Sequence, residues 1–406
     1  MSLNGHRYDV GGVLLERPFK IRRLGHFGFN FDKLEEAREF YGDLLGFTVS
    51  DKADFSRAPW FPKDQGLGDN HGYFMRYGTD HHAMVLFSKP VMDVRADRKF
   101  MPEVTINQIT WQCGSLKEIA EAHSYFEEQQ VPIQRVGRDM PGSNWHTYVY
   151  DPDGHTNELY YGIEQIGWNQ RSKPRDMYYR GFREKPGLPQ MSEAAEIAEA
   201  QTKGIDIFSG NRPDVPIGET YDVEGVLLAR PFKITKIGPV ALFVDGVDRA
   251  EAFYTQRLGL TRSEDADYKG ARCTFLRCGL EHHSLALFPK ELRKTLGLRP
   301  DTTCMSFGVE LGSYAQLRAA VKFLKGRGCT LIEIPPELYP GIDYSAFALD
   351  PDGHCIQLYY YMEQIGWDGR VRPASERRKI NGEGWPEVLQ PLSDTYADQV
   401  FQGPLG

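Results

Sequence analysis

Residues that could bind a metal ion or move a proton are concentrated in the first half of the chain. Eight of the eleven histidines lie in residues 1–213. His26, in LGHFGF, and Glu158, in HTNELYY, both lie in runs typical of β-strands. A buried carboxylate without a partner is costly, so a metal ion or another cation is the favoured partner of Glu158. His26 and Glu158 are therefore candidates for binding a metal ion, and another cationic group is the alternative partner of Glu158.

The chain around these residues repeats itself. Residues 7–25 match 220–238 at 13 of 19 positions, and residues 151–170 match 350–369 at 13 of 20. A third match, GTDHHAMVLFSK with GLEHHSLALFPK, lies between these two in both halves. Three collinear matches predict an internal duplication.

Within each half, segments typical of strands and helices follow in the order β-α-β-β-β, twice. In the first cycle the strand of His26 precedes a helix-like segment that ends at Gly46, and three strand-like runs follow. The last strand of the second cycle, which holds Glu158, follows a DPDG turn. The chain after it is rich in Pro, Gly and charge and is predicted to be a connector with one short helix near 192–202. The predicted domains are 1–165 and 220–362, with a connector at 166–219 and a C-terminal tail at 363–406.

This order, with LGHFGF at the first strand and DPDGHTNELYY at the last, resembles the vicinal oxygen chelate superfamily. That superfamily includes glyoxalase I, fosfomycin-resistance proteins and type I extradiol ring-cleavage dioxygenases. The resemblance covers about 20–165 and 233–362, and two paired cycles in each half look most like the extradiol dioxygenases. It implies an α+β fold in which four βαβββ modules pair into two half-barrel domains.

The resemblance also implies roles for individual residues. The 2-His-1-carboxylate metal site of the extradiol enzymes falls on His26, Gln108 and Glu158, with Gln108 where the family has a second His. A carbonyl oxygen is a poorer ligand than imidazole, although relatives of glyoxalase I do use Gln. The family's proton-transferring His falls on His81, and the Tyr that binds a substrate oxygen falls on Tyr148.

One further residue is a candidate for the predicted site. His146 has the same strand parity as Tyr148 and no His counterpart in the second half, so it is a reserve candidate for proton transfer or metal ligation. Asp139 stands where the family has another His. His82, like His155, has a counterpart in the second half and is predicted to be structural.

The second half lacks the predicted ligands. At the positions of His26, Gln108, Glu158 and Tyr148 it carries Pro239, Ser306, Gln357 and Phe347. Proline has no side-chain donor, and the other three anchor a divalent ion less well. We therefore predict a metal-binding first domain and a degenerate second domain.

Composition limits the remaining possibilities. The chain has 406 residues, a net charge of −8 and 41% hydrophobic residues, which favours packed domains. It has no run of about 18 apolar residues and no basic cluster, so neither a membrane nor a nucleic acid is expected as a partner. Six cysteines without a CxxC pair favour free thiols in a cytoplasmic protein. A homo-oligomer is expected.

The predicted function is an Fe(II)-dependent extradiol-type dioxygenase that cleaves a catecholic or related dihydroxylated aromatic substrate with O₂. Mn(II) or another divalent ion is the alternative metal. Two other functions fit the same residues: a glyoxalase-like metal-dependent isomerase or lyase, and a metal-free protein that binds a small planar ligand. The fold alone does not decide between them.

Overall fold

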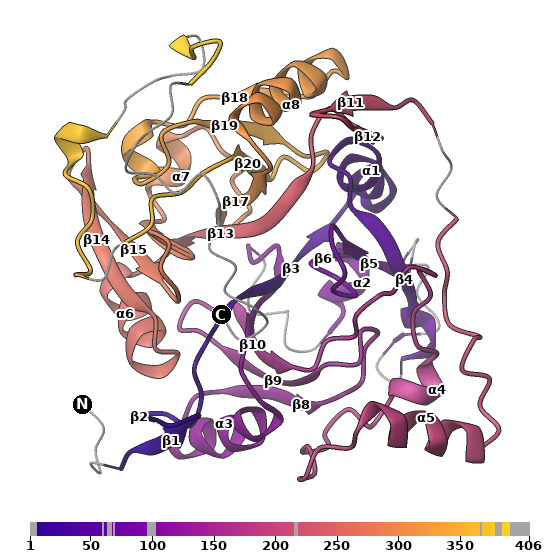
Figure 1. Cartoon of the computed structure of the whole chain (residues 1–406). Coiled ribbons are helices and arrows are strands. Elements are labelled where there is room, and N and C mark those ends of the chain that lie inside the picture. The colour runs from indigo at the N-terminus through magenta and orange to yellow at the C-terminus, as the bar shows by residue number, and fades with distance from the viewer. Residues whose placement is uncertain are drawn as a thin grey trace. The chain divides into compact units, whose positions relative to one another are not determined.

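The computed structural model divides the chain into two compact units, one formed by Met1–Asp43 and Phe47–Pro216 and the other by Leu44–Gly46 and Ile217–Gly406 (Figure 1). The structure describes residues 6–58, 61–62, 67, 70–95, 103–214, 218–365, 368–377 and 384–389. Most of the predicted C-terminal tail, 363–406, lies outside these ranges. Each unit is described by itself below.

The first unit is built on one eight-stranded sheet with the strand order β4-β5-β6-β3-β7-β10-β9-β8. Its first module consists of β3 (Arg23–Phe31), α1 (Leu34–Glu39), β4 (Thr48–Asp54), β5 (His71–Arg76) and β6 (Met84–Ser88). Its second module consists of β7 (Ile106–Gln112), α3 (Leu116–Glu128), β8 (Ile133–Gly137), β9 (Trp145–Tyr150) and β10 (Thr156–Tyr161). The first strands of the two modules, β3 and β7, pair antiparallel at the centre of the sheet. This confirms the predicted α+β fold with paired βαβββ modules.

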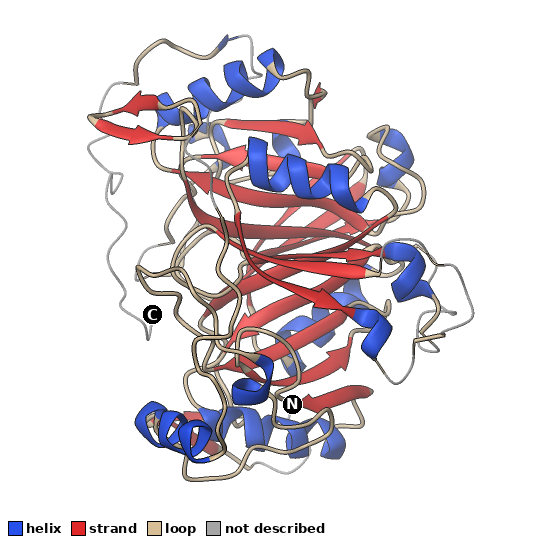
Figure 2. Ribbon diagram, turned by 90° about the vertical axis from the view of Figure 1, so that its right-hand side faces the viewer, coloured by secondary structure: helices blue, strands red, loops and turns tan. Residues whose placement is uncertain are grey.

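The helices pack on the sheets (Figure 2). Ser115 caps α3: its hydroxyl accepts a hydrogen bond from the backbone N–H of Glu118 and donates one to the Glu118 carboxylate. The buried residues Ile119 and Phe126 lie on the face of α3 that packs against β8, β9 and β10. The first predicted helix is shorter than expected, because α1 passes into a π-helical turn over Phe40–Leu44.

The connector belongs to the first unit and contains two helices, α4 (Arg175–Tyr178) and α5 (Glu193–Thr202). The second was predicted from the sequence and the first was not. Minor elements of this unit are the hairpin β1 (Tyr8–Val10) and β2 (Val13–Leu15), a 3₁₀ turn (Phe55–Arg57) and α2 (Lys89–Asp93).

The second unit has the same strand order, β14-β15-β16-β13-β17-β20-β19-β18. Its strands are β13 (Ile234–Val244), β14 (Thr261–Tyr268), β15 (Ala271–Arg277), β16 (Leu285–Pro289), β17 (Cys304–Leu311), β18 (Leu331–Ile332), β19 (Ser345–Leu349) and β20 (Cys355–Tyr359). Its helices are α6 (Val247–Ala252), continued by a π-helical turn (Phe253–Arg257), α7 (Leu292–Thr295) and α8 (Tyr314–Gly326). The remaining elements are the hairpin β11 (Tyr221–Val223) and β12 (Val226–Leu228) and two 3₁₀ turns (Pro336–Leu338 and Ala374–Glu376).

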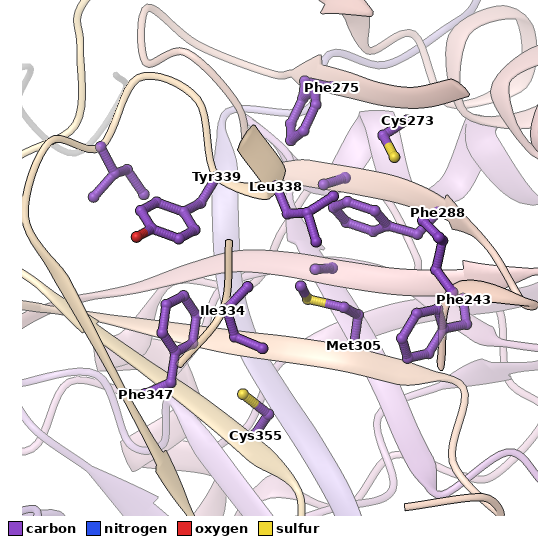
Figure 3. Packing of buried hydrophobic residues seen from close by; sticks show 14 of the residues in the cluster. Phe243, Cys273, Phe275, Phe288, Met305, Ile334, Leu338, Tyr339, Phe347 and Cys355 are labelled. Carbon is purple, nitrogen blue, oxygen red and sulfur yellow. The ribbon is translucent and has the colours of Figure 1, made fainter. Parts of the chain in front are cut away.

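An apolar cluster fills one face of the second sheet (Figure 3). Phe243, Phe275 and Phe347 come from three of its strands, and Leu338 and Tyr339 from the loop that covers them. All are buried.

In the part of the chain that the structure describes, no helix is long and apolar enough to cross a lipid bilayer.

Candidate active site

Five side chains form one row across the first sheet. The register pairs His26 of β3 with Thr110 of β7, Thr110 with Glu158 of β10, Glu158 with Tyr148 of β9, and Tyr148 with Arg135 of β8. Side chains alternate between the two faces of a strand, and partners in register point to the same face. The row therefore combines residues of both modules on one face of the sheet.

The carboxylate of Glu158 is the centre of this row. Its Oε2 lies 2.9 Å from Nε2 of His26, and accepts hydrogen bonds of 2.9 Å from the amide of Gln108 and of 2.9 Å from the hydroxyl of Thr110. Its Oε1 accepts a hydrogen bond of 2.8 Å from the amide of Asn144. Burial opposes ionisation, yet the charge and hydrogen bond of His26 hold the pKa of Glu158 below its ordinary value. Glu158 is thus an ionised carboxylate held by several donors.

Tyr148 joins this carboxylate to a second charged group. Its hydroxyl hydrogen-bonds to Glu158, and burial followed by the charge of Glu158 raises its pKa well above the ordinary value. The phenol therefore stays protonated at neutral pH and can donate a hydrogen bond. The guanidinium of Arg135 lies over the Tyr148 ring, 3.9 Å from its centroid.

His146 and Asp139 form a buried pair beside Tyr148. Nε2 of His146 lies 2.7 Å from Oδ1 of Asp139, and its Nδ1 lies 3.5 Å from Oε1 of Glu158. Burial opposes ionisation of Asp139, but the charge of Arg135 and the hydrogen bond to His146 lower its pKa. His146 itself lies behind the wall of the cavity described below, whereas Asp139 is part of that wall.

His81 and His82 precede β6 and have different positions. Their Nδ1 atoms lie 3.0 Å apart, and the His82 ring packs on His26 with 4.2 Å between ring centroids. His82 lines the cavity and His81 does not. Burial, then the nearby His26 and His81, lower the pKa of His82 well below its ordinary value, so it is a neutral imidazole.

The row faces a cavity of about 1360 Å³. His26, Gln108, Glu158 and Tyr148 line it, and Phe55, Phe74, Phe87 and Met92 contribute apolar wall. The connector provides another wall, with Pro174, Tyr178, Tyr179, Phe182 and Asn211 among its residues. An apolar cavity with a few convergent polar groups is the usual form of a small-molecule site.

One protein-family model matches both copies of this fold. The model of the Glyoxalase/Bleomycin resistance protein/Dioxygenase superfamily matches residues 23–159 and again residues 236–358, well over half of the chain. The chain belongs to this superfamily. The resemblance to vicinal oxygen chelate proteins that the sequence predicted is therefore confirmed, and the first match contains the whole row from His26 to Glu158.

The individual proteins that resemble this chain do so at low sequence identity. Metapyrocatechase 2 of Cupriavidus necator is 26% identical over 150 residues, which span 36% of this chain and 38% of that protein. The Mn(II)-bound glyoxalase of Novosphingobium aromaticivorans has a TM-score of 0.53 at 14% identity, covering 86% of this chain and 85% of that one. The 2,3-dioxygenase LapB of Pseudomonas sp. KL28 has a TM-score of 0.54 at 14% identity, covering 86% and 95%. The two structures share the fold with this chain.

The second copy of the superfamily fold carries a different row. Gly308 pairs with Gln357, Gln357 with Phe347, and Phe347 with Ile332. These residues stand at the positions of Thr110, Glu158, Tyr148 and Arg135. Pro239 precedes Val240, the partner of Phe307, and so stands at the position of His26. The row of the second unit holds no carboxylate, no imidazole and no guanidinium.

The spacing of the donors in the first unit suits a divalent ion. Two ligands in adjacent positions of an octahedral ion, each about 2.1 Å from it, lie about 3 Å apart. The 2.9 Å from His26 Nε2 to Glu158 Oε2 has this length, and the amide nitrogen of Gln108 donates a hydrogen bond of 2.9 Å to the same oxygen. No group of three or more His, Cys, Asp or Glu that could hold a metal occurs among the described residues. The residues available as ligands are therefore the imidazole of His26, the carboxylate of Glu158 and, once its amide is turned over, the side-chain oxygen of Gln108.

Several polar residues of the site were not predicted. Thr110 and Asn144 bind Glu158 directly, and Arg135 covers Tyr148. Thr110 could have been found, because it lies two residues from Gln108 and therefore on the same face of the strand. Asn144 lies in a loop, to which no such periodicity applies.

Proposed function

We propose that this protein is a metal-dependent extradiol-type dioxygenase that cleaves a catecholic aromatic ring. The observation that supports this most directly is the 2.9 Å contact between His26 and Glu158 on the wall of a large cavity. The relative from Cupriavidus necator and several structural neighbours bear the names of catechol-cleaving enzymes, which favours the same chemistry.

His26, Glu158 and the amide oxygen of Gln108 would hold the ion, with Fe(II) as the first candidate and Mn(II) as the second. A divalent ion held by three protein ligands keeps positions open for two adjacent substrate oxygens and for O₂. Thr110 and Asn144 would fix the carboxylate of Glu158 in this role, because each donates to one of its oxygens.

Other residues of the wall would orient the ring and move its protons. The protonated hydroxyl of Tyr148 would exchange its hydrogen bond to Glu158 for one to a substrate oxygen, a role proposed for it from the sequence. His82 is a neutral imidazole on the wall and would accept a proton from a catechol hydroxyl. His81, to which the sequence assigned this role, would act by positioning His82 through their 3.0 Å contact, while the pair of His146 and Asp139 would stabilise the position of Tyr148.

Metal content and oxygen consumption test this proposal. Protein purified without chelators and reconstituted with Fe(II) under anaerobic conditions should bind about one ion per chain and consume O₂ with at least one ortho-diphenol. His26→Ala and Glu158→Ala should lose both. Gln357→Ala, at the position of Glu158 in the second unit, is the matched control and should retain both. Full metal occupancy in both first-unit variants would refute the proposed ligands.

A metal-dependent isomerase or lyase is the second candidate, because Gln108 as a ligand is a feature of relatives of glyoxalase I. Such an enzyme would turn over without O₂, so equal activity in aerobic and anaerobic buffer would favour it.

A metal-free binding protein is the third candidate. Its specific support is the set of hydrogen bonds from Gln108, Thr110 and Asn144, which satisfy Glu158 by protein donors alone. Tight binding of a catechol that is unaffected by EDTA, with no oxygen uptake under any metal, would favour this function.

A further inference from the structure

A pair of acidic residues occupies the same place in both units, and only the second unit supplies it with an arginine. In the second unit, Glu264 and Glu363 lie on either side of Arg377. The guanidinium is 2.6 Å from Glu264 through Nη1 and 3.7 Å from Glu363 through Nε. His282 adds a contact of 2.9 Å to Glu264. The two carboxylates are therefore neutralised from within the chain.

Asp51 and Glu164 are the corresponding acids of the first unit. Asp51 pairs with Phe74 in the sheet as Glu264 pairs with Phe275. The carbonyl of Glu164 accepts a 2.8 Å hydrogen bond from the backbone N–H of His81, as Glu363 does from His282. The surroundings of the two pairs are thus the same in backbone and in the adjacent histidine.

The position of the arginine is taken by Tyr178. The backbone N–H of Lys173 donates 2.7 Å to the Glu164 carboxylate, and the backbone N–H of Arg372 donates likewise to Glu363. Five residues further along the chain stand Tyr178 in the first unit and Arg377 in the second. Tyr178 is buried, and Asp51 and Glu164 contribute to the raised pKa of its hydroxyl after burial itself.

The acids of the first unit therefore lack the arginine that lies between the acids of the second unit. Among the residues that the structure describes, no lysine or arginine side chain forms an ion pair with Asp51 or Glu164; the ammonium of Lys173 pairs with Glu193 and Glu196 instead. Burial raises the pKa of Glu164, and the negative charge of Asp51 adds to this shift, although the charges of His81 and Lys173 and the hydrogen bond from the Lys173 backbone oppose it. Asp51 accepts a 2.9 Å hydrogen bond from the hydroxyl of Ser172.

A second, independent observation points to a ligand at this place. The side chain of His81 is fully buried, and its Nε2 has no hydrogen-bond partner although it lies 3.5 Å from Oδ2 of Asp51. Asp51 and Tyr178 both line the cavity. The cavity wall thus carries the carboxylate of Asp51, and directly behind it lies an imidazole nitrogen of His81 without a hydrogen-bond partner.

We propose that Asp51, with Tyr178 beside it and the charge of Glu164 behind it, binds a cationic group of the ligand, namely a primary ammonium. In the second unit the guanidinium of Arg377 lies between the corresponding acids. In the first unit the ammonium group of the ligand would take that place. A metal ion is a poorer occupant, because no set of three metal-binding side chains occurs here among the described residues.

This inference rests on the proposed function, which places the catechol ring of the same ligand at His26 and Glu158. Contacts lead from the metal ligands to the acids: His26 packs on His82 at 4.2 Å between ring centroids, His82 on His81 at 5.3 Å, and His81 reaches Asp51. The substrate class is therefore a catechol that carries an alkylamine side chain.

Three catechols of similar size that differ in charge test it: dopamine, 4-ethylcatechol and 3,4-dihydroxyphenylacetate. Their affinities for the full chain are measured by calorimetry at pH 7 under anaerobic conditions. The ammonium compound should bind about 10-fold or more tightly than the neutral compound, and the carboxylate should bind most weakly. Asp51→Asn should remove this preference, so that the ratio of the affinities for dopamine and 4-ethylcatechol falls to about one.

Tyr178→Arg is the second variant, because it supplies the arginine that the second unit carries. It should also abolish the preference for the amine, whereas Tyr178→Phe should retain most of it. Equal affinities for the three catechols, or tighter binding of the carboxylate to the cationic residues Lys52, Arg175 and Arg183 that also line the cavity, would overturn the inference.

If the proposed function is wrong, these binding experiments give a different result from the one expected if only the cation site is wrong. If no catechol binds at all, phenethylamine is used as the probe. Binding that is lost in Asp51→Asn would then support the cation site and refute the catechol proposal, and absence of binding would refute both.

Discussion

Nε2 of His26 and Oε2 of Glu158 lie 2.9 Å apart although their strands are not neighbours. The strand β7 separates β3 from β10, and adjacent strands are about 4.8 Å apart, so the two backbones are separated by roughly twice that distance. The side chains converge above Thr110, the short residue between them in the row. Since β3 belongs to the first module and β10 to the second, neither module alone could form the site.

Replacing Gln108 with histidine should strengthen metal binding. Imidazole is a better donor than an amide oxygen, and Gln108→His would give the two-histidine, one-carboxylate set that suits Fe(II). We expect the metal dissociation constant to fall by at least the roughly 10-fold that changes around a metal site typically produce. Titration with Fe(II) under anaerobic conditions measures it. Ser306→His, at the matching position of the second unit, should give no gain, and equal gains in both variants would contradict the assignment.

Replacing Tyr148 with phenylalanine should separate chemistry from metal binding. The second unit carries Phe347 at this position, also buried, so the ring is expected to pack without the hydroxyl. Loss of a proton-donating group from the site should lower kcat by about 10²-fold, while metal content stays at the wild-type value. Steady-state oxygen uptake and metal analysis of the same sample are the measurements. An unchanged kcat would show that the hydroxyl does not contact the reacting atoms.

The connector should be necessary for ligand binding, because one buried ion pair anchors it. Arg138, directly after β8, and Glu196 of α5 are 2.6 Å apart, with side chains only 8% and 7% exposed. Removing one partner of a buried pair leaves an unpaired charge, so Glu196→Ala should destabilise the connector by roughly 3 kcal/mol and weaken ligand binding. Limited proteolysis and calorimetry would report both effects.

Glu199→Ala is the control for this variant. Glu199 is on the same helix, is more exposed and pairs with Arg180 and Lys203 at the surface. Its loss should cost less than about 1 kcal/mol. If both variants bind ligand as the wild type does, the connector wall has no part in recognition.

The sequence could predict that the proposed ligands His26 and Glu158 lie together, because both are in strands and both have a counterpart in the second half. His26, Glu158 and Tyr148 could be placed on one face by alternation along strands, and the substitutions Pro239, Gln357 and Phe347 distinguished site from scaffold. The repeated order of strands and helices was sufficient for the fold.

The choice between His81 and His82 could not be made in this way. Both residues precede β6, where no period of two applies, and both have counterparts in the second half. Which ring faces the cavity depends on packing against His26, a contact between segments far apart in the chain. The place of the connector on the cavity wall was missed for a similar reason, since the hydrogen bonds from Ser172 to Asp51 and from Asn211 to the carbonyl of Ser50 have no local pattern.

A buried carboxyl group in the second unit should make stability depend on pH near neutrality. Burial first, and then the charge of Glu281, raise the pKa of Glu310 to about 7, although Lys236 opposes this shift. Between the ordinary pKa of about 4.5 and pH 7, the folded protein keeps a proton that the unfolded chain loses. The contribution of Glu310 is therefore fully present below pH 4.5 and is lost as pH rises through 7, a change on the order of 3 kcal/mol.

Glu310→Gln tests this sign, and the first unit carries glutamine, Gln112, at the same place in the sheet. Glutamine keeps the shape and does not titrate. The free energy of unfolding, from urea titrations between pH 5 and pH 8, should fall with rising pH more steeply for the wild type than for Glu310→Gln. Because all other titrating groups are common to the two proteins, the difference between the curves isolates this carboxyl group. Parallel curves would mean that Glu310 is already ionised in the folded protein at pH 5, with Lys236 neutralising it.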